Sequence, residues 1–216
     1  MTLILAAKHQ EGIVTVSDTI GYGAKGSYYT QKVRPIGNGT AIMGFAGEFL
    51  SESPDEHIAR YSQAMPSGIC SKLDPREPLR TLSSMVSQDT KAASSDPDWF
   101  RSPANWNAYL FGIEKKGIFK SSEVSLYVHD QNSNIFSLQP VSYYDLGTKF
   151  PEVRQILEES ANSKGSIEDL IFGMKRALEM GKELSRANPS TGRIIQGTQV
   201  GIFTKDGYKV LEFSEN

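Results

Sequence analysis

The sequence predicts an α+β fold built as a four-layer αββα sandwich, in which two antiparallel sheets lie between two layers of helices. Three observations predict this class. Strand-like segments come in two blocks, at residues 3–46 and 106–138, and helical patterns follow each block. Two further strand patterns close the chain around Asp206-Gly207, a dipeptide typical of hairpin turns. Two sheets flanked by helices form such a sandwich.

The first block consists of strand patterns joined by polar turns. An apolar run covers residues 3–7, and a second strand pattern covers residues 12–17. Residues 28–36 have an extended pattern, which places Lys32 in a short extended segment. Residues 40–46 are mostly apolar and end near two glycines, so we expect a buried strand there.

Helical spacing predicts the layers that flank the sheets. We expect one helix near Asp55 and another at about residues 77–92. After the second strand block, residues 153–157 carry the apolar face of a third helix. A longer helix begins at Ser166, where Asp169 completes an acidic variant of the capping box. The apolar stripe of this helix comprises Ile167, Leu170, Ile171, Met174, Leu178 and Leu184.

The second block and the end of the chain supply the remaining strands. Their patterns cover residues 106–113, 124–129, 134–138, 197–204 and 208–213. A chain of 216 residues lies within the range of one domain, so we expect residues 1–216 to form a single domain.

Composition excludes several classes of function. Hydrophobic residues make up 38% of the chain and the net charge is −2, with no long basic run. We therefore expect neither nucleic acid nor an anionic membrane as a partner. No stretch approaches the roughly 20 apolar residues of a membrane helix, and no signal-peptide pattern precedes the first strand. Cys70 is the one cysteine, which excludes an internal disulfide and favours a reducing, cytoplasmic location.

The start of the chain carries the strongest chemical signal. Thr2 directly precedes the first apolar run, and its small side chain predicts removal of Met1. A terminal threonine carries a nucleophile and a base on one residue, because its α-amine can take the hydroxyl proton. This amine titrates at about pH 8, so much of it is neutral in cells. The alternative is a threonine that merely leads into a strand.

Three further residues would complete a catalytic set. Asp18 follows the second strand pattern, Lys32 lies in the next extended segment, and Gly44 lies in the buried strand after it. A charged Lys32 near Thr2 would lower the pKa of the hydroxyl and the amine, and Asp18 would offset the cost of burying that ammonium. Gly44 has no side chain, so its N–H can approach a developing oxyanion. Taken singly, Asp18 and Lys32 would be read as an ordinary ion pair.

In order and spacing these residues resemble the proteasome β-subunit family of N-terminal nucleophile (Ntn) hydrolases. The matching motifs are Thr2, Ser17-Asp18-Thr19, Lys32-Val33 and Gly44-Phe45-Ala46-Gly47. The resemblance implies an Ntn-type αββα fold, threonine endopeptidase activity, a polypeptide substrate and a homo- or hetero-oligomeric ring of proteasome-like subunits. By family position it also implies a substrate pocket lined by Gly21, Arg34, Ile42 and Ala46.

Two stretches depart from the family pattern. The family motif Asp-Ser-x-Ser-Gly falls at residues 188–192, where Asn188 and Thr191 are expected to support the terminal amine by hydrogen bonding alone. The family step Gly-Ser-Gly falls at residues 145–148, where Leu146 cannot bond to an amine. The sequence is therefore expected to be a divergent member of the family.

Together the residues predict an amide-bond hydrolase that needs no metal or organic cofactor. Thr2 would be the nucleophile, Asp18 and Lys32 would set the electrostatics, and the Gly44 N–H would bind the oxyanion. Two alternatives stay open. A transpeptidase or ligase would use the same ester intermediate, and a non-catalytic structural subunit would keep the fold without the chemistry.

Overall fold

The computed structural model describes both ends of the chain and the strands and helices that surround Thr2. The described residues are 1–23, 26–36, 39, 41–47, 107–116, 122–130, 135–136, 140–188 and 194–215. They form two five-stranded sheets, a two-stranded hairpin and two helices. Every strand pair in these sheets is antiparallel.

The first sheet has the spatial order β10-β1-β2-β11-β12. Its strands are β1 (Leu3–His9), β2 (Gly12–Ser17), β10 (Tyr143–Gly147), β11 (Thr198–Thr204) and β12 (Gly207–Ser214). Leu3 lies opposite Gly147 on one side of β1, and Ile4 lies opposite Ser17 on the other. The strand that follows Thr2 is therefore flanked by partners on both sides.

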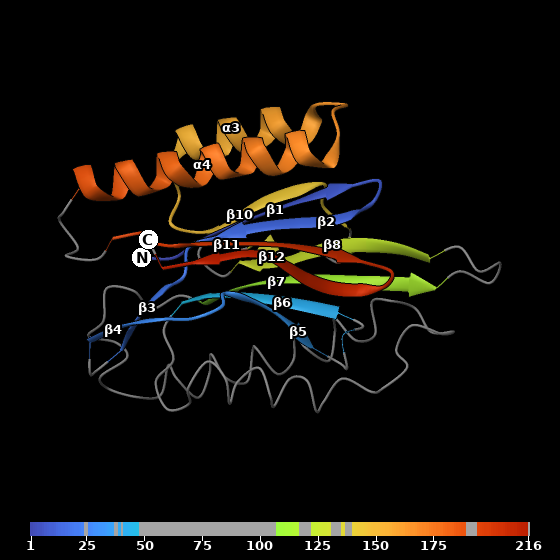
Figure 1. Ribbon diagram of the computed structural model, residues 1–216, viewed down its shortest axis with the longest axis horizontal. Coiled ribbons are helices and arrows are strands. Elements are labelled where there is room, and N and C mark those ends of the chain that lie inside the picture. The colour runs from blue at the N-terminus through green and yellow to red at the C-terminus, as the bar shows by residue number, and fades with distance from the viewer. Residues whose placement is uncertain are drawn as a thin grey trace.

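The second sheet has the spatial order β5-β6-β7-β8-β9. Its strands are β5 (Val33–Ile36), β6 (Ala41–Gly47), β7 (Asn107–Lys116), β8 (Ser122–Asp130) and β9 (Ile135–Phe136). A small hairpin, β3 (Ile20–Gly23) and β4 (Gly26–Tyr29), lies between β2 and β5 in the chain. Figure 1 shows the two five-stranded sheets stacked face to face, with both helices above the first sheet.

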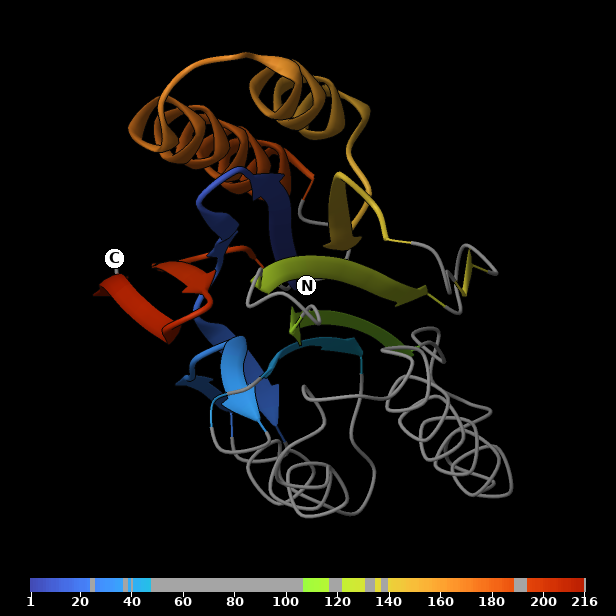
Figure 2. The same ribbon diagram turned by 90° about the vertical axis from the view of Figure 1, so that its right-hand side faces the viewer.

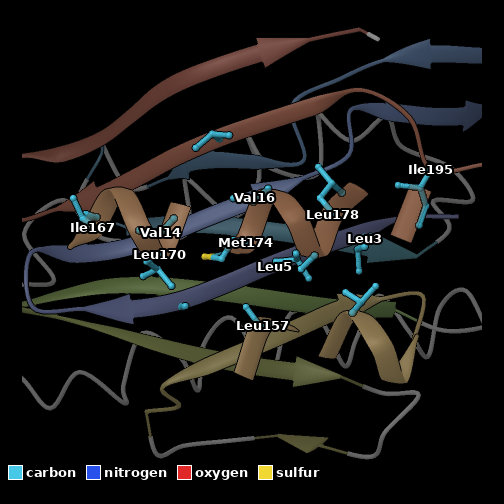
Figure 3. Packing of buried hydrophobic residues seen from close by; sticks show 14 residues of the cluster. Leu3, Leu5, Val14, Val16, Leu157, Ile167, Leu170, Met174, Leu178 and Ile195 are labelled. Atoms are coloured by element: carbon cyan, nitrogen blue, oxygen red, sulfur yellow. The ribbon is translucent and has the colours of Figure 1, made fainter. Parts of the chain in front are cut away.

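Alternation along β1 builds two buried cores. Leu3, Leu5 and Ala7 pack against the helices, whereas Ile4 and Ala6 pack against the second sheet. Figure 3 shows Leu3 and Leu5 among the side chains of β2 and the helices. Fully burying a leucine or isoleucine contributes roughly 1.5–3 kcal/mol. Both cores thus fix the position of β1, and with it the position of the residue before it.

The two helices are α3 (Pro151–Asn162) and α4 (Ile167–Ala187). The predicted capping box is confirmed, because Ser166 Oγ accepts from the Asp169 N–H at 3.2 Å and Asp169 Oδ2 accepts from the Ser166 N–H at 2.9 Å. The predicted stripe on α4 forms part of the core over the first sheet. Figure 2 shows both helices, in gold and orange, on the same side of that sheet. Neither described helix meets the length and hydropathy needed to span a membrane.

The α+β class with antiparallel sheets is confirmed, some details differ from expectation, and some predictions are not tested by the described residues. The helices predicted near Asp55 and at residues 77–92 lie outside the described residues, as does Cys70. Lys32 is not inside a strand but in the bend that precedes β5. The β3-β4 hairpin and β10 were not predicted, because neither shows a clear alternation of apolar and polar residues. The single domain over residues 1–216 stays a prediction.

Candidate active site

Thr2 lies directly before β1, and its carbonyl is held by the chain that follows β10. The Thr148 N–H donates to the Thr2 carbonyl oxygen at 2.8 Å. Gly147, which pairs with Leu3, has a φ of 100°, in the left-handed region that favours glycine. A Cβ at this position would collide with the Thr2 carbonyl oxygen. Glycine therefore allows the close approach that fixes Thr2 from its C-terminal side.

Asp18 follows β2 and holds the other side of the same chain segment. Its side chain has no solvent exposure, and its Oδ1 accepts from the Leu3 N–H at 2.8 Å. The Asp18 N–H donates to the Leu3 carbonyl at 3.1 Å. Asp18 Oδ2 makes no hydrogen bond to any described residue. One carboxylate oxygen thus orders the backbone after Thr2, and the other is left for electrostatic contact.

Lys32 connects these two groups. Its Nζ donates to Thr2 Oγ1 at 3.3 Å and lies 3.8 Å from Asp18 Oδ2, which is within ion-pair range. The Lys32 side chain is only 9% exposed. The predicted Thr2, Asp18 and Lys32 set therefore comes together at one place, although the three residues belong to different segments of the chain.

Burial dominates the electrostatics of this cluster. Burial raises the pKa of the Asp18 carboxyl above its ordinary value of 3.8, while the Lys32 ammonium, the Leu3 N–H and the terminal ammonium oppose that rise. A carboxylate without exposure needs a cation nearby to remain charged. Among the described side chains, Lys32 supplies a cation within ion-pair distance of Asp18, and this favours the charged carboxylate.

The register of β6 differs from the expectation for Gly44. N–H groups alternate in direction along a strand. The Phe45 N–H donates to the Lys32 carbonyl at 3.4 Å, so the odd-numbered residues of β6 direct their N–H toward β5. Gly44 lies between Val33 and Leu110, and its N–H is directed toward β7. The Gly44 N–H therefore lies on the side of β6 that faces away from Lys32. A sequence motif gives the spacing of residues but not the direction of their N–H groups in the sheet.

The N–H of Gly47, unlike that of Gly44, is directed to the side of β6 on which Lys32 lies. Gly47 ends β6, and it shares the N–H direction of Phe45. The pairing of β5 with β6 starts at Val33 and Gly44, so β5 as described has no residue opposite Gly47. A backbone donor on the Lys32 side of β6 is therefore expected at Gly47, the last residue of the motif at residues 44–47.

The four predicted substrate-binding residues lie in two settings. Gly21 pairs with Tyr28 in the β3-β4 hairpin, and Arg34 donates to Thr30 Oγ1 at 2.6 Å. Ile42 and Ala46 belong to the core between the two sheets and are 0% and 1% exposed. Contact of any of the four with a substrate stays a prediction.

The residues discussed for the terminal amine also lie in different parts of the fold, and one of them lies outside the described residues. Asn188 ends α4, where its N–H donates to the Leu184 carbonyl at 3.1 Å and its side chain is exposed. Thr191 lies outside the described residues. Leu146 is fully buried between the sheets. Thr148, in the stretch where the family step Gly-Ser-Gly falls, contacts the Thr2 carbonyl through its backbone N–H.

Within the described ranges, no group of three or more His, Cys, Asp or Glu side chains is arranged to hold a metal ion.

Comparisons with known proteins define the fold and correct the family assignment. No model of a protein family matches the chain, and no curated protein matches it. Solved structures do match. One is an Anbu (Gly-1) mutant from Hyphomicrobium sp. strain MC1, with a TM-score of 0.63 and 15% sequence identity. The match covers 100% of this chain and 87% of that chain.

The predicted membership of the proteasome β-subunit family is therefore wrong, because no family model supports it and a likeness at 15% identity shows the fold alone. That fold is the mixed α+β, Ntn type that the sequence predicted.

Proposed function

We propose that this chain is a threonine-type endopeptidase that hydrolyses peptide bonds with Thr2 as nucleophile. One observation carries the proposal: the Lys32 ammonium lies between Thr2 Oγ1 at 3.3 Å and Asp18 Oδ2 at 3.8 Å, in a nearly buried setting. A cation donating to a hydroxyl stabilises the alkoxide form of that hydroxyl, which is the form that attacks a carbonyl. An ordinary surface ion pair would not include the hydroxyl of the second residue.

The reaction begins with hydrolysis of the Met1–Thr2 peptide bond, which gives Thr2 a free amine. This amine takes the proton from Thr2 Oγ1 as the oxygen forms a bond to the substrate carbonyl carbon. The substrate C–N bond then breaks, and the Thr2 ammonium gives its proton to the leaving amine. Water then attacks the resulting ester and gives a proton to the Thr2 amine. When the ester C–O bond breaks, the Thr2 ammonium returns this proton to Thr2 Oγ1 and a carboxylic acid leaves.

The neighbouring groups stabilise charge along this path. Lys32 faces the oxygen on which negative charge develops, and the Asp18 carboxylate, 3.8 Å from Lys32 Nζ, offsets the cost of burying that ammonium. The Gly47 N–H, on the Lys32 side of β6, is the proposed donor to the oxyanion of the substrate. A preorganised donor of this kind lowers a barrier by about 3 kcal/mol.

The proposed substrate is a polypeptide in extended conformation. The β3-β4 hairpin that carries Gly21 is tied to the chain before β11, because the Tyr22 hydroxyl donates to the Ile194 carbonyl at 3.0 Å and accepts from its N–H at 2.9 Å. Such an anchored hairpin suits recognition by strand addition. A ring of copies or of related subunits is proposed as the assembly that would enclose the site.

The experiment is covalent labelling of the purified protein with a peptide vinyl sulfone or a β-lactone, followed by mapping of the modified residue. We expect loss of Met1 by intact mass, one adduct at Thr2, and no adduct in Thr2→Ala. Thr204→Ala is the matched control, because its hydroxyl accepts from the Asp206 N–H in the β11-β12 turn, away from the cluster. Retention of Met1, or peptide cleavage that survives Thr2→Ala, would contradict the assignment.

A non-catalytic role is the second candidate, and the surroundings of the terminal amine favour it. Leu146 is buried and apolar, and Asn188 carries no charge, so neither can hold an ammonium by ion pairing. A protein that loses Met1 yet neither labels at Thr2 nor cleaves peptides would support this candidate. Cleavage in the presence of an added amine, with analysis of the products, separates hydrolysis from transpeptidation.

A further inference from the structure

We propose that Gln199 is the positioning residue that sets Lys32 against Thr2, by joining the first sheet to the open edge of the second. The proposal rests on the proposed function, because positioning matters only if Lys32 serves the Thr2 hydroxyl. Gln199 belongs to β11 and is 1% exposed. It belongs to none of the motifs formed by Thr2, residues 17–19, residues 32–33 and residues 44–47.

Every hydrogen-bonding position of the Gln199 amide is used. Its Oε1 accepts from the Lys32 N–H at 2.8 Å and from the Val33 N–H at 3.3 Å. Its Nε2 donates to the Val33 carbonyl at 2.7 Å and to the Tyr208 hydroxyl at 3.1 Å. An amide has two donors and two acceptor positions. Because both backbone N–H groups require an acceptor, the orientation of the amide is fixed.

These contacts replace a missing strand. In the described part of the chain β5 is the outermost strand of the second sheet, so one side of its backbone has no strand partner. Buried backbone groups at such an edge need other partners. Gln199 bonds both the N–H and the carbonyl of Val33, as a neighbouring strand would. A side chain of the first sheet thereby continues the hydrogen bonding of the second.

The consequence for Lys32 is that its backbone is held from two directions. The Lys32 N–H is bonded to Gln199 of the first sheet, and the Lys32 carbonyl accepts from the Phe45 N–H of β6 at 3.4 Å. Lys32 itself lies in a bend, where no regular ladder would fix it. A lysine side chain has a long, flexible stem, so the placement of Nζ at 3.3 Å from Thr2 Oγ1 depends on a fixed backbone.

The Gln199 amide is in turn hydrogen-bonded to the hydroxyl of Tyr208, which pairs with that of Thr15. The Tyr208 hydroxyl lies 3.2 Å from Thr15 Oγ1, which in turn donates to the Gly201 carbonyl at 3.4 Å. With Nε2 donating to Tyr208, the donor direction runs from Gln199 through Tyr208 and Thr15 to a backbone carbonyl. Burial raises the pKa of Tyr208, which keeps this hydroxyl neutral and able to donate.

The test compares Gln199→Met with Thr198→Val and wild type. Gln199→Met keeps the side-chain length and removes all four hydrogen bonds of the amide. The backbone of Lys32 is then no longer fixed to the first sheet. We expect kcat to fall about 10- to 100-fold, as for displacement of a catalytic group by about 1 Å, with KM changed less than about twofold. Thr198→Val removes a buried hydrogen bond to Lys182 Nζ from the neighbouring position on the same strand, and should leave kcat within about twofold of wild type.

Gln199→Glu covers the case in which Gln199→Met does not fold. A glutamate keeps an acceptor for the two N–H groups and, when ionised, loses both donors, so its kcat should lie below wild type and above that of Gln199→Met. An unchanged kcat in either folded Gln199 variant overturns the proposal. So does an equal loss of kcat in Thr198→Val, because the loss would then follow stability rather than the position of Lys32.

A measurement that does not use activity separates this proposal from the function on which it rests. Hydrogen exchange of the segment that contains Lys32 and Val33 should be at least tenfold faster in Gln199→Met than in wild type, and unchanged in Thr198→Val. Unchanged exchange in Gln199→Met overturns the proposed hold on Lys32. A third outcome combines two results: wild-type protein does not label at Thr2, and exchange is nevertheless faster in Gln199→Met. This outcome overturns the proposed function and leaves Gln199 as a structural link between the sheets.

Discussion

Lys32 Nζ lies 3.3 Å from Thr2 Oγ1, and this distance joins the start of the first sheet to the edge of the second. The ammonium also lies 3.8 Å from the buried Asp18 carboxylate. A change at one of these residues should therefore alter both the stability of the fold and the reactivity of the hydroxyl. Removing single members and pairs distinguishes the two effects.

Lys32→Met should abolish most activity and destabilise the protein. Loss of one preorganised electrostatic group lowers kcat by about 100- to 1000-fold. Removing one partner of a buried ion pair costs about 3–5 kcal/mol, because Asp18 is left as an uncompensated buried charge. Urea unfolding and peptide cleavage measure the two effects. The double variant Lys32→Met/Asp18→Asn should regain stability without regaining activity; recovery of both would contradict a catalytic role for Lys32.

The stability contribution of Asp18 should decrease as the pH rises. Burial raises the folded-state pKa of this carboxyl above 3.8, so the folded chain binds its proton more tightly than the unfolded chain does. The contribution is therefore fully present below pH 3.8 and is lost as the pH rises through the raised pKa. The measurement is the free energy of unfolding of wild type minus that of Asp18→Asn, from urea titrations at several pH values. A difference that increases with pH would contradict the sign.

Gly44→Ala should leave kcat within about twofold of wild type and should not destabilise the chain, because the new methyl reduces the freedom of the unfolded state. A Cβ at this position would lie 3.4 Å from Val33 Cγ2 and 3.5 Å from Ile4 Cδ1, which are ordinary contacts. Steady-state cleavage and thermal unfolding check both statements. A tenfold or larger loss of kcat would show that the site needs the close approach that only glycine allows at position 44, which contradicts the placement of the oxyanion donor at Gly47.

Gly147→Ala should lower both stability and activity. Gly147 and Gly207 both have positive φ, at 100° and 106°, so alanine is strained at either position. Only at Gly147 would the methyl collide with the Thr2 carbonyl, whereas at Gly207 the nearest contact is 3.8 Å away. Gly207→Ala is therefore the matched control for backbone strain. Cleavage assays should show a loss for Gly147→Ala alone; equal activities in the two variants would contradict the positioning of Thr2 by β10.

Ser166→Ala should destabilise the protein by about 1 kcal/mol without changing kcat, because it removes the side-chain cap of α4. Chemical denaturation measures the loss, and the cleavage assay should be unaffected since the cap lies at the start of α4, away from Thr2. A fall in kcat at constant stability would show that α4 contributes to the site in a way that the described contacts do not include.

Much of the fold could be predicted because its signals are local. The capping box at Ser166, the stripe on α4 and the Asp-Gly turn between the last strands each depend on residues that are close in the sequence. The pairing of β10 with β1 could not be predicted, because Leu3 and Gly147 meet only in the folded chain. The β3-β4 hairpin was missed because its glycines hide the alternation of a strand.

The candidate site divides in the same way. Thr2, Asp18 and Lys32 were selected by residue type and order, and the structure brings them together. The choice between Gly44 and Gly47 required the direction of N–H groups in the ladder, which spacing does not contain. Gln199 carries no local signal, since a single glutamine in a strand gains its meaning only from the edge strand beside it. Sequence thus predicted the reacting groups better than the groups that hold them.

The contacts to the Thr2 carbonyl and to the Leu3 N–H are already formed with Met1 in place. Both lie on the downstream side of the residue, so cutting the preceding peptide bond disturbs neither of them. Under the proposed function, removal of Met1 would therefore be a purely covalent event that unmasks a base, with no refolding of a precursor. The expected signature is a mature form whose backbone near the new terminus superimposes on that of the unprocessed chain.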